Sequence, residues 1–173
     1  MTDLVRLYAQ IALLRRGPQD VPASMLLLVI TVSAYFCVNA LVTLMLPALG
    51  EPWFLMLAVD VLFTLTWYSV LLHLLRKPER FLQTATAVFG FRAVMSPFLI
   101  VSAWLLRRLI SEDAVWQFPL AMLYVAIVVW MIAANSQILK VALEWSAGAC
   151  IALVILETLV ALVLQFSLFS VTH

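Results

Sequence analysis

The sequence predicts an all-α, polytopic membrane protein: a bundle of five transmembrane helices preceded by a short amphipathic interfacial helix. Composition is the first reason, because 66% of the 173 residues are hydrophobic and 11% are charged, whereas soluble domains carry about 25% charged residues. Spacing is the second, because the apolar residues gather in stretches of about 20, the length that crosses a bilayer as a helix. We therefore expect a membrane domain with almost no soluble mass.

Residues 1–23 are expected to form a cytoplasmic amphipathic segment. Asp3, Arg6 and Arg15 take the polar faces, and Gly17 and Pro18 end the pattern. A helix of this kind lies on the membrane surface with its apolar face in the headgroup layer. Its apolar stripe consists of Leu4, Leu7, Tyr8, Ile11 and Leu14. Membrane anchoring is the simpler interpretation of this segment, and docking of a cytoplasmic partner is the more specific one.

The membrane domain, residues 24–173, divides into five apolar stretches. The expected spans are 24–46, 53–75, 81–106, 115–134 and 145–169. Pro47 and Gly50 end the first span, and Arg76 with Lys77 closes the second. The third contains Pro97, which is expected to kink it by removing a backbone donor. The fourth is expected to be the shortest span.

Orientation follows from the Lys and Arg residues at alternate span ends. One side receives Arg6, Arg15, Arg16, Arg76, Lys77, Arg80 and Lys140, whereas the other receives Arg107 and Arg108 beside Glu112 and Asp113. Basic residues concentrate on the cytoplasmic side of membrane proteins. The prediction is a cell (inner) membrane protein with a cytoplasmic N-terminus and an external C-terminus.

Three charged residues inside the spans, Asp60, Arg92 and Glu157, are the informative polar positions. Such charges cost a few kcal/mol each on insertion scales and normally find a partner in the bundle interior. At ~1.5 Å per residue, Arg92 lies roughly 16 Å and Glu157 roughly 18 Å from the cytoplasmic span ends, so these two are expected to pair. Asp60 and Asn39 share a depth of roughly 22 Å and are expected to hydrogen-bond.

The same charged residues admit two interpretations. An internal salt-bridge network that fixes helix register is the simpler one. An ion or proton path, or a binding site for a lipid headgroup, is the more specific interpretation. A relay usually needs several titratable groups between both faces, and the spans offer few others. The network interpretation is therefore the favoured one at this point.

Small residues mark candidate helix contacts. Gly148 and Ala152 lie on one side of the fifth span, opposite Glu157, and Gly90 belongs to a small-residue stripe on the third span. Small residues let membrane helices approach closely. These positions, with the kink at Pro97, are expected to serve packing.

The chain carries no catalytic or metal-site motif: no paired-histidine zinc motif, phosphate-binding glycine loop or nucleophile elbow occurs. We expect no catalytic residue, no metal, no cofactor and no enzymatic activity. A formal net charge of +1 gives no reason to expect nucleic acid as a partner.

The chain resembles the Yip (Ypt-interacting protein) family of five-span membrane proteins, bacterial inner-membrane type. The resemblance rests on the five-span plan, on the third-span segment VFGFRAVMSPFLI with Gly90, Phe91 and Pro97, and on NSQILKVALEWSAG leading into ALVILETLVALVL with Glu157. It implies a fold and a membrane location more than an activity. Arg92 and the short N-terminal segment depart from the pattern, which argues against transferring the trafficking role of eukaryotic relatives.

Two functions remain open from the sequence. The first is a non-enzymatic integral membrane protein that scaffolds a partner or organises lipid, with the N-terminal helix and cytoplasmic loops as its contact surface. The second is a small transporter or channel subunit that uses Glu157, Arg92 and Asp60. The expected partners are the lipid bilayer and a membrane or cytoplasmic protein, and a homo-oligomer is compatible with five short-looped helices.

Overall fold

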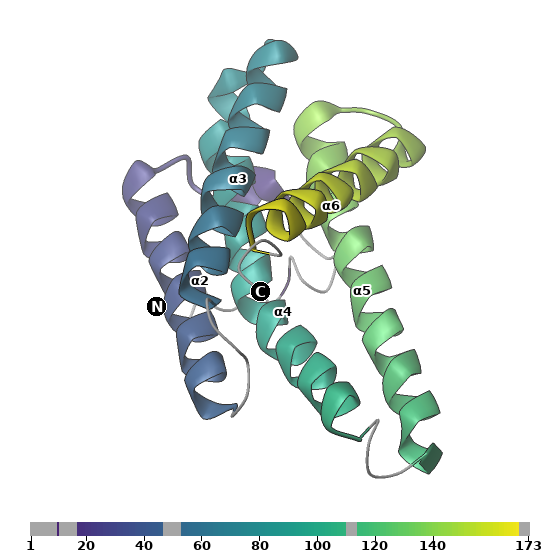
Figure 1. Cartoon of the computed structure of the whole chain (residues 1–173). Coiled ribbons are helices and arrows are strands. Elements are labelled where there is room, and N and C mark those ends of the chain that lie inside the picture. The colour runs from purple at the N-terminus through teal and green to yellow at the C-terminus, as the bar shows by residue number, and fades with distance from the viewer. Residues whose placement is uncertain (1–9, 11–16, 47–52, 110–113, 170–173) are drawn as a thin grey trace.

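A computed structural model describes residue 10 and residues 17–46, 53–109 and 114–169. The described residues contain five long helices and no strand, and all five are long and apolar enough to cross a membrane (Figure 1). Their bounds are α2 Met25–Met45, α3 Trp53–Leu74, α4 Phe81–Leu109, α5 Ala114–Leu143 and α6 Ala147–Phe169, with short 3-10 helices η1 Pro18–Asp20 and η2 Pro78–Arg80. The predicted all-α fold class with five helices of membrane-spanning length is confirmed.

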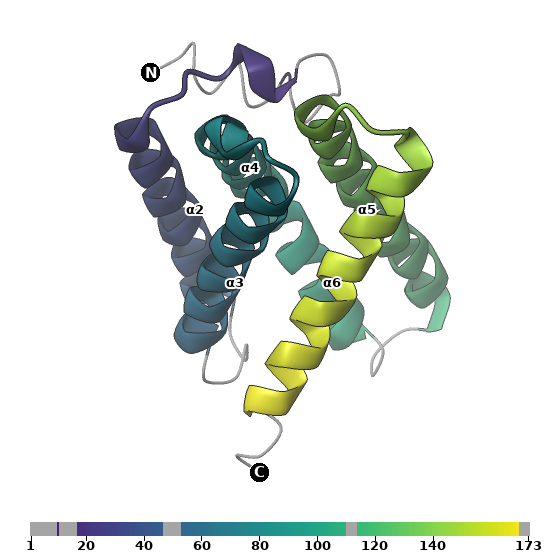
Figure 2. The ribbon, with the colours of Figure 1, turned by 90° about the horizontal axis from the view of Figure 1, so that it is seen from above.

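Helix α4 occupies the middle of the bundle. It contacts α2, α3 and α5, while α6 contacts α3 and α5, so that the five helices enclose a common interior. Figure 2 shows α2 and α3 on one side of α4 and the α5–α6 pair on the other. The α3–α4 and α5–α6 connections lie at the same end of the bundle as η1. We call this end, which carries Lys77, Arg80 and Glu144, the basic end.

Local sequence signals explain where several helices begin and end. Ser24 and Ser146 precede α2 and α6, and each side-chain oxygen accepts a bond from the backbone N–H three residues later, at 3.4 Å. Helix α3 ends with Arg76 at a positive φ of 57°, and Lys77 N donates to Leu72 O at 2.9 Å. This bond is characteristic of a Schellman termination, in which a left-handed residue lets the chain leave the helix.

The predicted end of the fourth span is wrong. Helix α5 does not stop near Ala134 but continues to Leu143, which makes it the longest of the described helices. The polar run after Ala134 stays helical, and two of its side chains are buried: Asn135 and Ser136 are nearly inaccessible, and Ser136 Oγ donates to Ala133 O at 2.8 Å, whereas Gln137 is exposed. Polarity alone does not end a helix when the bundle covers the polar residues.

The most closely packed part of the interior lies toward the basic end. Tyr68, Leu72, Phe91 and Leu139 are fully buried there, and Val21 from the segment after η1 joins the same cluster. A second cluster, between α2, α3 and α4, includes Leu28, Val61 and Phe89. The contacts of η1 with α4 and α5 close the bundle at this end.

The outward faces of the helices are apolar. Large exposed side chains occur on every long helix; examples are Leu44, Leu62, Phe98, Phe118 and Val163. Exposed apolar area of this extent marks a surface that lipid covers. The chain is therefore a multi-pass membrane protein.

The small-residue predictions have different outcomes. Gly90 is buried in α4, as expected for a packing position. Gly148 and Ala152 are exposed, and a Cβ placed on Gly148 meets nothing within 4 Å, so the expected close contact of this pair within the chain is wrong. They lie on the side of α6 that faces away from the bundle. Helix α4 runs continuously through Pro97, and the predicted kink there stays a prediction.

The predicted interfacial stripe, Leu4, Leu7, Tyr8, Ile11 and Leu14, lies outside the described residues.

Candidate binding site at a buried ion triad

Asp60 on α3, Arg92 on α4 and Glu157 on α6 meet in the bundle interior, and we call them the ion triad. Arg92 Nη2 donates to Glu157 Oε1 at 2.8 Å, and Arg92 Nη1 lies 3.5 Å from Asp60 Oδ2. The guanidinium thus lies between two carboxylates from different helices. The predicted pairing of Arg92 with Glu157 is confirmed.

Two tyrosines complete the hydrogen bonding of the carboxylates. Tyr68 donates its hydroxyl to Glu157 Oε2 at 2.9 Å, and Tyr35 donates to Asp60 Oδ2 at 3.1 Å. Thr64 Oγ1 accepts a bond from Arg92 Nη1 at 2.8 Å. A buried charge needs such partners because an unpaired one loses its hydration without compensation.

The three charged side chains differ in their exposure. The side chain of Glu157 is 3% exposed, that of Arg92 is 14% and that of Asp60 is 21%. Both Glu157 oxygens have close donors, whereas among the described residues Asp60 Oδ1 accepts no hydrogen bond. Glu157 is therefore the inner member of the triad, and Asp60 is the member with an open acceptor.

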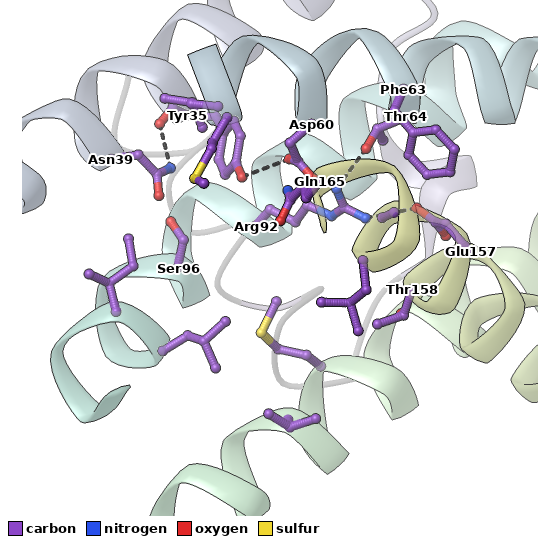
Figure 3. Close-up of a pocket in the computed structure, with 18 of the residues that line it drawn as sticks. Tyr35, Asn39, Asp60, Phe63, Thr64, Arg92, Ser96, Glu157, Thr158 and Gln165 are labelled. Carbon is purple, nitrogen blue, oxygen red and sulfur yellow. Dashed lines mark hydrogen bonds and ion pairs between the residues drawn. The ribbon is translucent and has the colours of Figure 1, made fainter. Parts of the chain in front are cut away.

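The triad borders a cavity of about 640 Å³ that all five long helices line (Figure 3). Charged and polar lining residues are Tyr35, Asn39, Thr43, Asp60, Thr64, Arg92, Ser96, Asn135, Glu157, Thr158 and Gln165. Aromatic and thioether side chains from Trp53, Phe63, Tyr124, Met56 and Met131 form much of the remaining wall. The volume falls within the range of about 300–1,000 Å³ typical of small-molecule sites.

The cavity lies in one half of the bundle only. Its lining residues Thr43, near the end of α2, and Trp53, at the start of α3, belong to the end opposite the basic end. Toward the basic end, the fully buried Tyr68 and Leu139 fill the interior instead. The triad consequently forms the boundary between an open half and a packed half.

Two polar atoms in the cavity wall lack partners among the described residues. They are Ser96 Oγ on α4 and Asn135 Oδ1 on α5, and both side chains are more than nine-tenths buried. Figure 3 shows Ser96 across the cavity from Glu157, on the same helix as Arg92. Buried polar atoms in native proteins are nearly always hydrogen-bonded, so these two atoms are available to a polar group that enters the cavity.

Comparison with protein-family models, curated proteins and solved structures found no match. The resemblance to the Yip family therefore stays a prediction.

One predicted pair is wrong. Asn39 does not bond Asp60; its Nδ2 donates to Tyr35 O, one turn earlier on its own helix, at 2.7 Å. Tyr35 reaches Asp60 instead because its longer side chain spans the gap between α2 and α3. Asn39 and Asp60 still border the same cavity. The prediction that they lie at a similar depth is therefore consistent with the structure, whereas the predicted hydrogen bond between them is not.

Tyr68 is the site residue that sequence reasoning missed. It lies eight residues after Asp60, and Thr64 lies between them, so the three occupy one face of α3 at helical spacing. The i, i+4, i+8 pattern of polar-tipped side chains was the available signal. Within the described residues, no three His, Cys, Asp or Glu side chains gather closely enough to hold a metal ion.

A second charged cluster lies at the basic end. Glu144, just after α5, pairs with Lys77 at 2.9 Å and with Arg80 at 2.6 Å. Hydrogen bonds from Lys77 and Arg80 hold the pKa of the Glu144 carboxyl below its usual range. Lys77 also donates to Leu143 O. Arg80 donates to Val141 O and Ala142 O. These bonds satisfy the open carbonyls at the end of α5, so the cluster serves as a helix cap.

Proposed function

We propose that this chain is a small membrane carrier or channel subunit that admits a solute into the central cavity. The observation that carries the proposal is the position of the triad. A salt bridge that only fixed helix register would be enclosed by packing on all sides, but Asp60 and Arg92 border open volume. Functional charges inside membrane proteins characteristically face such cavities.

The unequal distribution of basic residues between the two ends of the bundle supports a direction of access. Because basic residues concentrate on the cytoplasmic side of membrane proteins, the basic end is assigned to the cytoplasm and the cavity to the outside. The packed core around Tyr68 then separates the cavity from the cytoplasm. In this arrangement a solute enters from outside and reaches the triad, and the cytoplasmic side opens only when the core rearranges.

Cysteine accessibility tests the proposal. In a background with Cys37→Ser and Cys150→Ala, Ser96→Cys on the cavity wall should react with a membrane-impermeant methanethiosulfonate applied from outside. Val88→Cys, on the same helix but fully buried in the packed half, is the matched control and should remain unreactive. A Ser96→Cys thiol that reacts no faster than the Val88→Cys thiol would show that no solute path reaches the triad.

Flux in reconstituted vesicles provides the second test. Under an imposed membrane potential, vesicles with a trapped pH indicator should show proton movement that Glu157→Gln abolishes while the protein still folds. If Glu157→Gln lowers only thermal stability and wild-type vesicles move no protons, Glu157 does not serve a proton path and its salt bridge with Arg92 is structural.

The scaffold hypothesis assigns its contact surface chiefly to the N-terminal stripe, which lies outside the described residues, and it stays a prediction. It is tested by crosslinking in native membranes, where a specific partner should be captured by the wild type and lost when Leu7 and Ile11 become polar.

A further inference from the structure

The charges around the cavity do not balance. Two carboxylates, Asp60 and Glu157, face one guanidinium, Arg92, and no other charged residue lines the cavity among the described residues. With all three groups ionised, the site carries one surplus negative charge. Inside a membrane such a charge costs a few kcal/mol unless a cation or proton neutralises it.

The surplus is available at Asp60 rather than at Glu157. Glu157 receives short bonds from Arg92 and Tyr68 on its two oxygens. Asp60 lies at the longer distance of 3.5 Å from Arg92, is the more exposed carboxylate, and keeps Oδ1 open. A cation entering the cavity would therefore meet Asp60.

The walls of the cavity suit a cation with an apolar body. Trp53, Phe63 and Tyr124 present aromatic rings, and Met56 and Met131 present polarizable thioethers. Ring faces attract cations, and the attraction strengthens away from water. A hydrated metal ion gains little from such walls, and the unpaired Ser96 Oγ and Asn135 Oδ1 offer acceptors to an ammonium N–H.

We propose that the cavity binds a monovalent organic cation, an ammonium or quaternary onium with an apolar body, with its charge at Asp60. This proposal rests on the proposed function and names its substrate class. The bound cation would neutralise the surplus negative charge that the triad carries when all three groups are ionised.

The groups that contact Asp60 come from α2 and α4. They are Tyr35, which donates to Asp60 Oδ2, and Arg92, which also pairs with Glu157 from α6. Helix α5 contributes the phenol of Tyr124 to the cavity wall. Arg92 remains charged at any pH a protein tolerates. The negative charge that attracts the cation therefore lies on the two carboxylates, and Asp60 is the more exposed of them.

Calorimetric titration of the full-length protein in detergent with tetraphenylphosphonium tests the proposal, with tetraphenylborate as an anion of matched shape. We expect saturable one-site binding of the phosphonium only. Asp60→Asn should weaken binding at least about tenfold. Glu144→Gln, which also removes one carboxylate charge but at the basic end, should leave the affinity for the phosphonium unchanged.

Several outcomes would overturn the proposal. Equal binding of phosphonium and borate would indicate partition into the micelle, and unchanged affinity in Asp60→Asn would place the cation elsewhere. Binding of sodium ion but not phosphonium would reject the organic cation. If Ser96→Cys is accessible yet phosphonium does not bind, this inference fails while the proposed function stands; if Ser96→Cys is inaccessible, the proposed function itself fails.

Discussion

At the scale of single residues, Arg92 determines whether the bundle interior tolerates two carboxylates. Its guanidinium contacts Asp60 and Glu157 through different nitrogens and uses Thr64 as a third partner. A planar guanidinium can serve several acceptors at once, whereas a lysine ammonium acts as a single point charge. Arg92 is thus the residue on which both acids depend.

Replacing Arg92 should be the most damaging single change in the site. Arg92→Met leaves two buried carboxylates without their cation, and breaking a buried pair in this way costs about 3–5 kcal/mol. The measurement is thermal unfolding in detergent, followed by tryptophan fluorescence.

The control for this prediction is the triple variant Arg92→Met, Asp60→Asn, Glu157→Gln, which removes all three charges. Its unfolding temperature should recover most of the loss, because no uncompensated charge remains. An Arg92→Met protein as stable as the wild type would mean that the triad adds nothing to folding.

At the scale of elements, the end of α5 depends on a neighbouring connection. Glu144 has a positive φ of 62°, which turns the chain out of the helix. Lys77 and Arg80, from the connection between α3 and α4, bind both its carboxylate and the last carbonyls of α5. The α5–α6 connection is thereby joined to α3 and α4, and the basic end is held together by charges as well as by apolar packing.

This cap should make stability depend on pH. Because the pKa of Glu144 is lowered in the folded protein, its stabilisation is complete above the ordinary carboxyl value of about 4.3 and disappears as the pH falls through the lowered value. Glu144→Gln should therefore unfold at a lower temperature than the wild type at pH 7, by a small margin because the carboxylate is exposed. The difference should vanish under strongly acidic conditions.

Glu79→Gln provides the comparison, since Glu79 is an exposed carboxylate of η2 without an ion pair to any described residue. It should match the wild type across the same pH range. If the unfolding temperature of Glu144→Gln stays below that of the wild type in acid, the loss of stability comes from changed geometry and not from the lost charge.

At the scale of the whole molecule, alternation of the helices places the two ends of the bundle in different compartments. Cysteines introduced at the exposed positions Glu79 and Arg107, one variant at a time without the native thiols, should be labelled by impermeant reagents from opposite sides. Glu79→Cys should react from the cytoplasm and Arg107→Cys from outside. Labelling of both from one side would overturn the threading and the access route proposed for the cavity.

Local chemistry determined the fold class and most of the spans. Hydropathy and the spacing of Pro, Gly and basic residues are properties of short segments, so the starts of α3 and α4 were predicted correctly. The end of α5 was not, because Asn135 and Ser136 are polar in sequence but buried in the bundle. Whether a polar residue continues a helix depends on neighbours that the segment itself does not contain.

The sequence by itself determined that the chain spans a membrane and that Arg92 and Glu157 share a depth, because helical rise converts residue number into height. Only the tertiary structure decided which side chains meet at that depth. Tyr35 rather than Asn39 reaches Asp60, Tyr68 supports Glu157, and a cavity borders the triad on one side. These outcomes depend on how each helix is rotated about its axis and which helices adjoin it, and neither quantity is encoded by position along a single span.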